Sequence, residues 1–201
     1  HDGIYTFYID NNELMSTRQN YSEIRLAEIV CEPLRSRKAR ILVGGLGFGF
    51  TLQAVLDAVS PESSVVVAEL LPIVIQWNQD ESLPLAHKTL KDPRVQLIQQ
   101  DVGAMITQQP PPFDAIILDV DNGPDGFTVD SNTDLYSQTG LQKLTAALHP
   151  GGTLGIWSAS SSPTFEKTLA KAGLKVRVEK CRSRPGNKGA THTLFLGQRR
   201  M

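Results

Sequence analysis

The sequence has little that would support a disulfide framework, a metal centre or a membrane span. Its 201 residues include two cysteines, Cys31 and Cys181, which stand far apart and form no C-x-x-C motif. No apolar run approaches the roughly 18 residues that a membrane-spanning helix requires, and no signal peptide is visible. We therefore expect a cytoplasmic protein with free thiols, and neither a metal nor a membrane partner.

An excess of charge of one sign is also lacking. The formal net charge is −1, so no general attraction to nucleic acid is expected. Residues 182–189 are basic but contain no aromatic residue on which a base could stack, so we interpret them as a solvated loop. RNA-directed methylation through this segment is the weaker alternative.

Neither a catalytic metal nor a hydrolase nucleophile is indicated. His87, His149 and His192 do not have the spacing of metal ligands, and the chain has no G-x-S-x-G motif. His192 stands in an apolar segment near the end of the chain, so we interpret it as a strand histidine with a satisfied ring. A role as a substrate contact or proton carrier is the alternative.

The length suits one domain with a sizeable core, and strand-like and helix-like segments alternate along it. The expected strands are residues 4–9, 13–17, 40–43, 64–68, 94–98, 113–118, 153–157, 174–178 and 191–196. The expected helices are residues 22–33, 52–59, 72–78, 137–148 and 164–172. Such alternation is typical of a mostly parallel sheet, whereas two strands joined by a loop alone should pair antiparallel.

These segments predict an α/β fold with a mostly parallel central sheet and an antiparallel last strand. A short N-terminal β-hairpin precedes them. We divide the chain into a hairpin and helix appendage at residues 1–34 and a ligand-binding α/β domain at residues 35–201.

The stretch ILVGGLGFGFTL, residues 41–52, organises the rest of the chain. A buried strand, a tight turn with glycines at alternate positions (Gly45, Gly47 and Gly49) and a helix are expected in that order. Glycines allow a ligand to approach the backbone closely, and the helix N-terminus offers unpaired N–H groups. The dinucleotide fingerprint needs glycines at its first, third and sixth positions, which neither register provides. The pattern favours an S-adenosyl sulfonium ligand over a purely structural turn.

Acidic residues follow the next three core strands: Glu69, Asp101 and Asp119. Ligands of open α/β sheets bind at the carboxyl ends of the strands. The first carboxylate can accept both hydroxyls of a ribose, and the second the exocyclic amine of adenine. The third reaches the reactive end of such a ligand. An acidic residue after a single strand is often only a turn residue, but acids after three consecutive strands indicate a ligand site more specifically.

These residues carry a resemblance to the spermidine synthase (polyamine aminopropyltransferase) family that extends over nearly the whole chain. The matching segments are YSE at 21–23, GGLGFG at 44–49, Glu69, DPRV at 92–95 with Asp101, FDAIILD at 113–119 and PGG at 150–152. The resemblance implies a Rossmann-like class I methyltransferase fold. It also implies decarboxylated S-adenosylmethionine as co-substrate, a small-molecule amine as acceptor, and a homodimer.

The resemblance also implies roles for individual residues. The cofactor-binding residues would be Gly45, Gly47, Gly49, Glu69 and Asp101. Asp119 would orient and deprotonate the attacking amine, with Tyr21 assisting. Alkyl amines are protonated at neutral pH (pKa about 10.4), so a carboxylate can both anchor the ammonium and accept its proton.

Two departures from the family leave other functions open. Gly47 stands where the family has an aspartate that contacts the aminopropyl amine, and Asn122 stands at the second acidic position after Asp119. Asp121 is shifted by one residue, and we expect Asp121 and Asn122 to contact the substrate. A site with fewer acids repels the carboxylate of intact S-adenosylmethionine less. Methyl transfer is therefore an alternative, and a non-catalytic nucleoside-binding relative is another.

Overall fold

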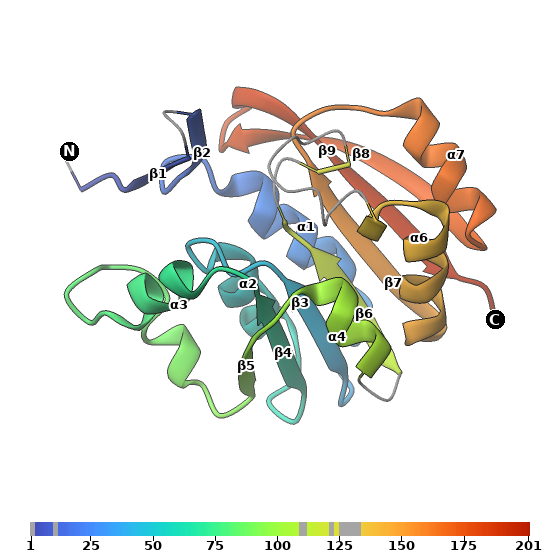
Figure 1. The fold of residues 1–201 in the computed structure, drawn as a ribbon, viewed down its shortest axis with the longest axis horizontal. Coiled ribbons are helices and arrows are strands. Elements are labelled where there is room, and N and C mark those ends of the chain that lie inside the picture. The colour runs from blue at the N-terminus through green and yellow to red at the C-terminus, as the bar shows by residue number, and fades with distance from the viewer. Residues whose placement is uncertain (1–2, 10–11, 109–111, 121–122, 125–133) are drawn as a thin grey trace.

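A computed structural model describes residues 3–9, 12–108, 112–120, 123–124 and 134–201 of the protein. These residues form a two-stranded N-terminal sheet and a seven-stranded central sheet (Figure 1). The strands are β1 (Thr6–Ile9), β2 (Asn12–Ser16), β3 (Arg40–Gly44), β4 (Ser64–Glu69), β5 (Val95–Gln99), β6 (Phe113–Leu118), β7 (Leu148–Ser158), β8 (Leu174–Arg184) and β9 (Lys188–Arg199). The helices are α1 (Tyr21–Cys31), α2 (Phe50–Ala58), α3 (Pro72–Gln79), α4 (Val102–Gln108), α6 (Gln138–Ala147) and α7 (Pro163–Lys171), with 3₁₀ turns at Glu32–Leu34 and Thr89–Lys91.

The central sheet has the strand order β5-β4-β3-β6-β7-β9-β8. The five strands from β5 to β7 are parallel, while β9 pairs antiparallel with both β7 and β8. This confirms the predicted α/β fold with its antiparallel last strand and its N-terminal hairpin of β1 and β2. Because β3 lies between β4 and β6, the glycine turn after β3 emerges between the ends of the two strands that precede Glu69 and Asp119.

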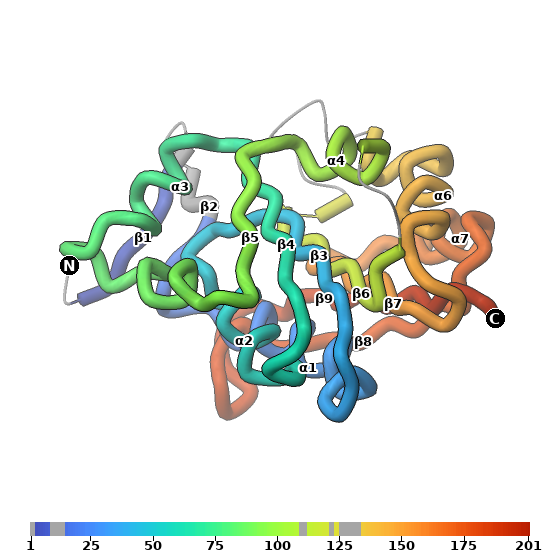
Figure 2. The backbone as a smooth tube through the Cα atoms, turned by 90° about the horizontal axis from the view of Figure 1, so that it is seen from below, coloured from blue at the N-terminus to red at the C-terminus, as the bar shows by residue number. Residues whose placement is uncertain are grey.

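Helices cover both faces of the sheet, as Figure 2 shows: α1 and α2 lie on one side, and α4 and α6 on the other. Successive residues of β3 point to opposite faces. Val43 belongs to a core cluster with Leu26 of α1 and Val55 of α2, whereas Leu42 belongs to a second cluster with Leu141 of α6. Burial on both faces explains why the central strands are continuous apolar runs rather than alternating ones.

Helix α1 packs closely against β7 because residue 155 is a glycine. A Cβ at Gly155 would stand 2.6 Å from Cγ2 of Val30 and 3.0 Å from Cδ1 of Leu26. At the carboxyl end of β7, the indole Nε1–H of Trp157 donates a hydrogen bond to Oγ of Ser22, 2.9 Å away, in the first turn of α1. The N-terminus of α1 therefore lies at the edge of the sheet where ligands of such folds bind. The division of the chain at residue 34 stays a prediction.

Several elements differ from the sequence prediction. Strand β7 begins at Leu148, which was predicted to end a helix, and not at residue 153. Helix α4 was not predicted, although Val102, Met105 and Ile106 have helical spacing and are buried. With seven residues it is too short for a strong periodic signal. Residues 182–189 were predicted as a loop, but β8 and β9 extend through most of them as far as the Arg184–Lys188 pair, with a shift of register between Arg182 and Arg184. Pairing between β8 and β9 stabilises this extension, and the residue pattern of either segment alone does not predict that pairing.

None of the helices in the described part of the chain combines the length and the apolar character needed to cross a bilayer.

Candidate cofactor and acceptor site

The glycine turn after β3 adopts a backbone that favours glycine at all three alternate positions. Gly45, Gly47 and Gly49 have φ values of 89°, 51° and 82°. A side chain at residue 45 would overlap the backbone carbonyl of Asp119, and one at residue 49 would overlap Ala86. The turn therefore holds two neighbouring segments at close range and leads directly into the N-terminus of α2.

Glu69, the last residue of β4, is fixed by two backbone groups. The Leu46 N–H donates to Oε2 and the Leu71 N–H donates to Oε1, each at 2.8 Å. The carboxylate thus ties the glycine turn to the start of α3. Each of its oxygens retains a second acceptor position for a ligand hydroxyl.

Asp101 follows β5 and stabilises the start of α4. The Ala104 N–H donates to its Oδ1 at 2.8 Å, which satisfies one unpaired donor of the first helical turn. Capping accounts for one carboxylate oxygen only. The other remains available to a ligand, so both the structural and the binding interpretation of Asp101 fit this geometry.

Asp119, which follows β6, carries a perturbed carboxyl group. Thr51 donates to its Oδ2 at 2.6 Å from the first turn of α2. Burial raises the pKa of Asp119 to about 6, against the lowering effect of that hydrogen bond. A carboxyl group with such a pKa can exchange a proton near neutral pH, which is the property required of a general base.

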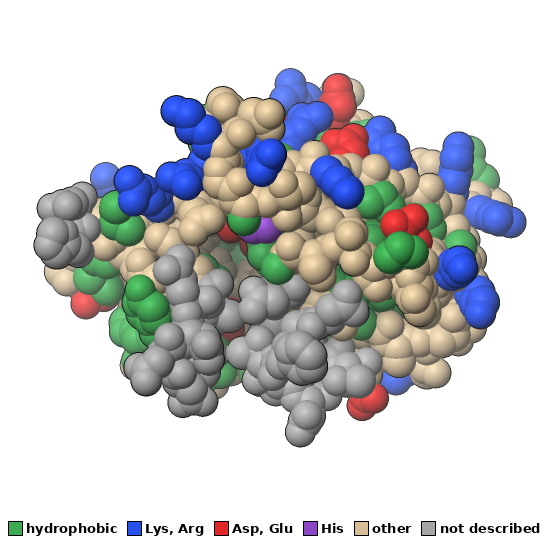
Figure 3. Space-filling model, turned by 90° about the horizontal axis from the view of Figure 1, so that it is seen from above, with side chains coloured by type: hydrophobic (Ala, Val, Ile, Leu, Met, Phe, Trp, Pro, Cys, Tyr) green, Lys and Arg blue, Asp and Glu red, His purple; other side chains and the backbone are tan. Residues whose placement is uncertain are grey.

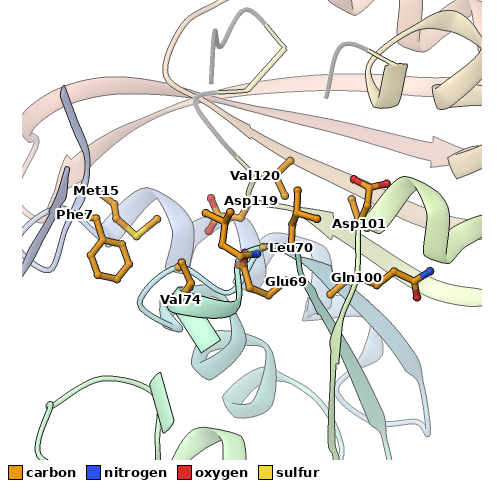
Figure 4. Close-up of a pocket in the computed structure, with 14 residues that line it drawn as sticks. Phe7, Met15, Glu69, Leu70, Val74, Gln100, Asp101, Asp119 and Val120 are labelled. Atoms are coloured by element: carbon orange, nitrogen blue, oxygen red, sulfur yellow. The ribbon is translucent and has the colours of Figure 1, made fainter. Parts of the chain in front are cut away.

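A pocket at the carboxyl edge of the sheet brings these three acids together, although they come from three separate strand ends (Figure 4). It contains about 680 Å³ of empty space including its open mouth. In Figure 4, Asp101 lies at one end near Gln100, Glu69 lies near the middle, and Asp119 lies toward the N-terminal hairpin.

The N-terminal hairpin covers the end of the pocket nearest Asp119 with apolar side chains (Figure 4). The ring centroid of Phe7 lies 4.2 Å from that of Phe48 in the glycine turn and 4.4 Å from that of Trp77 on α3. Met15 approaches the turn itself, because a Cβ at Gly47 would stand 2.9 Å from its Cε. An apolar thioether therefore occupies the space beside Gly47, where the family resemblance would place an aspartate.

A fourth acid, Glu23, was missed as a site residue. Burial, and after it the nearby Asp119 carboxylate, raise the pKa of Glu23 to about 8. The sequence contained a signal, since Glu23 is the last residue of the Tyr21-Ser22-Glu23 motif. The structure therefore adds a second carboxyl group beside Asp119.

The remaining predicted site residues are placed as follows. Tyr21 is the first residue of α1 and is 38% exposed. Within the described part of the chain its hydroxyl makes no hydrogen bond to Asp119, and its assisting role stays a prediction. Asp121 and Asn122 lie outside the described residues. Among those that are described, no group of three or more His, Cys, Asp or Glu side chains is arranged to hold a metal.

Over residues 71–191 the chain matches the model of a family of S-adenosyl-L-methionine-dependent methyltransferases. This match covers more than half of the 201 residues. The chain belongs to this family. The methyltransferase-family protein is also similar to polyamine aminopropyltransferase 2 of Pseudomonas aeruginosa, with 28% identity over 148 residues, 68% of this chain and 38% of that protein. The chain thus spans about two fifths of that curated relative.

Solved structures share the fold of this methyltransferase-family protein. Spermidine synthase from Thermotoga maritima superposes with a TM-score of 0.73 at 16% identity, covering 96% of this chain and 65% of that one. The N-methyltransferase NodS from Bradyrhizobium japonicum gives a TM-score of 0.60 at 15% identity, covering 90% and 95%. The predicted class I methyltransferase fold is therefore confirmed. The family and these relatives are transferases, which agrees with the predicted enzyme class.

Proposed function

We propose that this protein alkylates a cationic amine, with an aminopropyl group from decarboxylated S-adenosylmethionine as the group transferred. The observation that carries the proposal is a pair of carboxyl groups: Asp119, which lines the pocket, and the nearby Glu23, whose pKa is raised by burial and then by the Asp119 carboxylate. Two neighbouring carboxyl groups repel each other when both are ionised, so one of them ionises less readily. A bound ammonium group would neutralise their negative charge. A neutral acceptor would gain nothing from this pair.

The rest of the pocket fits an adenosyl group. Asp101, Glu69 and Asp119 follow one another along the pocket (Figure 4). In that order they would meet the adenine amine, the ribose hydroxyls and the reactive end. Gly45 and Gly47, which have no side chains of their own, line the pocket beside that path. The similarity to polyamine aminopropyltransferase 2 supports the same assignment.

When bound, the sulfonium supplies an activated carbon and a thioether leaving group. The residues of the chain then have to align the acceptor nitrogen and remove its proton. Asp119 is held by Thr51 in a fixed orientation and would accept the hydrogen bond of the ammonium. Its raised pKa matches the role of the base that takes the proton as the new bond forms. Tyr21 would assist at the mouth of the site.

Methyl transfer from intact S-adenosylmethionine is the second candidate, and Met15 favours it. Its methyl group fills the space beside Gly47, so no acid contacts the end of the cofactor there. Such an apolar neighbour gives no advantage to an aminopropyl ammonium over a methionine carboxylate. The family match, which is to methyltransferases, also supports this candidate.

Calorimetric titration with each cofactor, followed by a transfer assay on primary amines and diamines, tests the proposal. We expect tighter binding of the decarboxylated form and transfer to a diamine. Asp119→Asn should lower turnover by about 100-fold or more while changing the cofactor Kd by less than about twofold.

Asp57→Asn, on the exposed face of α2, is the matched control and should leave both quantities unchanged. Tighter binding of intact S-adenosylmethionine with methylated product would replace the proposal by the methyl transfer candidate. Cofactor binding without turnover on any amine would reject both and leave a nucleoside-binding relative.

A further inference from the structure

An amine that is alkylated has to lose a proton, and at this site the proton is released within the protein. As the C–N bond forms and the C–S bond breaks, the acceptor nitrogen gives up one proton, and Asp119 and Glu23 are the acids beside it. That proton must reach solvent before the next turnover. The inference below rests on the proposed function in this respect.

Ser22 lies next to Glu23 and is fully buried. Its Oγ is 2.7 Å from Oε2 of Glu23 and 2.8 Å from Nδ1 of His192. The third neighbour is the indole of Trp157, whose N–H donates to the same oxygen. An indole N–H only donates, so Ser22 always accepts from Trp157. One O–H and one acceptor position are left for Glu23 and His192 together.

This count allows two arrangements of the hydrogen bonds that link Glu23, Ser22 and His192. With Glu23 ionised, the Ser22 hydroxyl donates to the carboxylate and accepts from Nδ1–H of His192. With Glu23 protonated on Oε2, the carboxyl group donates to Ser22, and Ser22 donates to the bare Nδ1 of His192. Exchange between them moves a proton across the hydroxyl without changing its hydrogen-bond number.

We propose that Glu23, Ser22 and His192 form a proton relay that carries the proton released at the acceptor site toward solvent. Ser22 is fully buried. His192, on β9, is partly exposed and can pass a proton to water from Nε2. Figure 3 shows acidic side chains inside a hollow of this face of the molecule. Among the described residues, Asp119 lines the pocket whereas Glu23, Ser22 and His192 do not, so all three act through Asp119.

The groups around the relay are consistent with this direction. The Asp119 carboxylate, which lines the pocket, raises the pKa of Glu23, after the larger effect of burial. Burial lowers the pKa of His192 below 6.5, so its ring is neutral at pH 7 and can receive a proton. Cys181 pairs with His192 across the strands. Burial raises the pKa of the Cys181 thiol, Arg25 lowers it, and Glu179 and Glu23 raise it further.

The first test follows the His192 tautomer by ¹⁵N NMR and requires no activity. In the wild-type protein the ring should change from Nδ1–H to Nε2–H as pH falls from about 9 to about 7, because Glu23 becomes protonated. Glu23→Gln should abolish this change, and Glu28→Gln, on the exposed side of α1, should not. A tautomer that stays constant over this range, or that changes equally in Glu23→Gln, would overturn the relay.

The second test measures turnover with decarboxylated S-adenosylmethionine and a diamine. His192→Ala should lower turnover by about 10- to 100-fold with an unchanged substrate KM. Added imidazole should restore turnover in proportion to its concentration. His149→Ala, at an exposed position, is the control and should need no rescue. A purely structural histidine would give a loss that imidazole does not restore, and this result would reject the relay.

The two tests separate the relay from the proposed function. A wild-type protein without transfer activity, but with the pH-dependent tautomer change, would reject the proposed function and keep the hydrogen-bond chain as a proton path. Transfer activity that is unaffected by His192→Ala would keep the proposed function and reject the relay.

Discussion

At the scale of single residues, the chemistry is concentrated in carboxyl groups whose environments differ. Glu69 and Asp101 accept hydrogen bonds from backbone N–H groups. In contrast, burial raises the pKa of both Asp119 and Glu23. The first two acids are suited to hold neutral hydroxyl and amine groups. The second two are suited to hold a cation and to exchange protons.

This difference predicts how stability depends on pH. The pKa of Glu23 is raised from 4.5 to about 8, so the folded state keeps a proton that the unfolded state has already released. This contribution to stability is present below about pH 4.5 and is lost as pH rises toward about 8. Glu23→Gln should therefore be about 1–2 kcal/mol more stable than wild type at pH 9 and nearly equal to it at pH 5.

Urea denaturation at both pH values measures the effect, with Glu28→Gln as the control on the same helix. The pair Glu28 and Arg25 is exposed, so its removal should make little difference at either pH. A Glu23→Gln protein that is less stable than wild type at pH 9 would contradict the assignment of a costly buried charge.

At the scale of elements, the position of α1 decides which residues reach the site. Gly155 in β7 lets the helix approach, and the Trp157–Ser22 hydrogen bond fixes its first turn. Glu23 therefore depends on a strand more than a hundred residues away. The same helix contributes Leu26 and Val30 to the main core cluster, so core packing and site geometry are linked.

Gly155→Ala tests this link. The added methyl group meets Val30 and Leu26, so we expect a loss of about 1–3 kcal/mol from overpacking. Val30→Ala in the same chain should recover part of the loss, because it removes the nearest obstructing atom. Urea denaturation of the two single variants and the double variant provides the cycle. Strict additivity of the two changes would contradict direct contact between these positions.

At the scale of the whole molecule, the N-terminal hairpin and the α/β domain build the pocket together. Phe7 and Met15 come from the hairpin, while the acids come from strand ends of the central sheet. In the proposed binding mode, the hairpin lies beside the reactive end of the cofactor. We infer that it is the element through which cofactor preference is set.

Substitutions at Met15 and Gly47 test this inference. The φ of 51° at residue 47 is one that aspartate tolerates, and Met15→Ala removes the obstructing side chain. Met15→Ala with Gly47→Asp should improve the binding of decarboxylated relative to intact S-adenosylmethionine by about tenfold compared with Met15→Ala alone. Met15→Ala with Gly47→Asn is the neutral control in the same calorimetric titration. Equal effects of Asp and Asn would show that shape rather than charge is responsible.

Sequence alone determined most of the fold and one side of the site. The strand–turn–helix order around the glycines and the acids after the next three strands are local patterns. The structure brings Gly45, Gly47, Glu69, Asp101 and Asp119 to one pocket, while their binding roles stay predictions. Such local patterns depend on neighbours within a few residues, where propensity and periodicity act. Helix α4 was missed because its seven residues contain too few turns for that signal.

Tertiary structure decided which groups meet across the chain. Ser22 and His192 are 170 residues apart and share a hydrogen bond. Glu23 and Asp119 come from a helix and a strand end that approach because α1 packs on β7 through Gly155. Met15 covers Gly47 because the hairpin folds over the turn. These contacts depend on complementary packing between distant segments, and no local pattern in either segment encodes that packing.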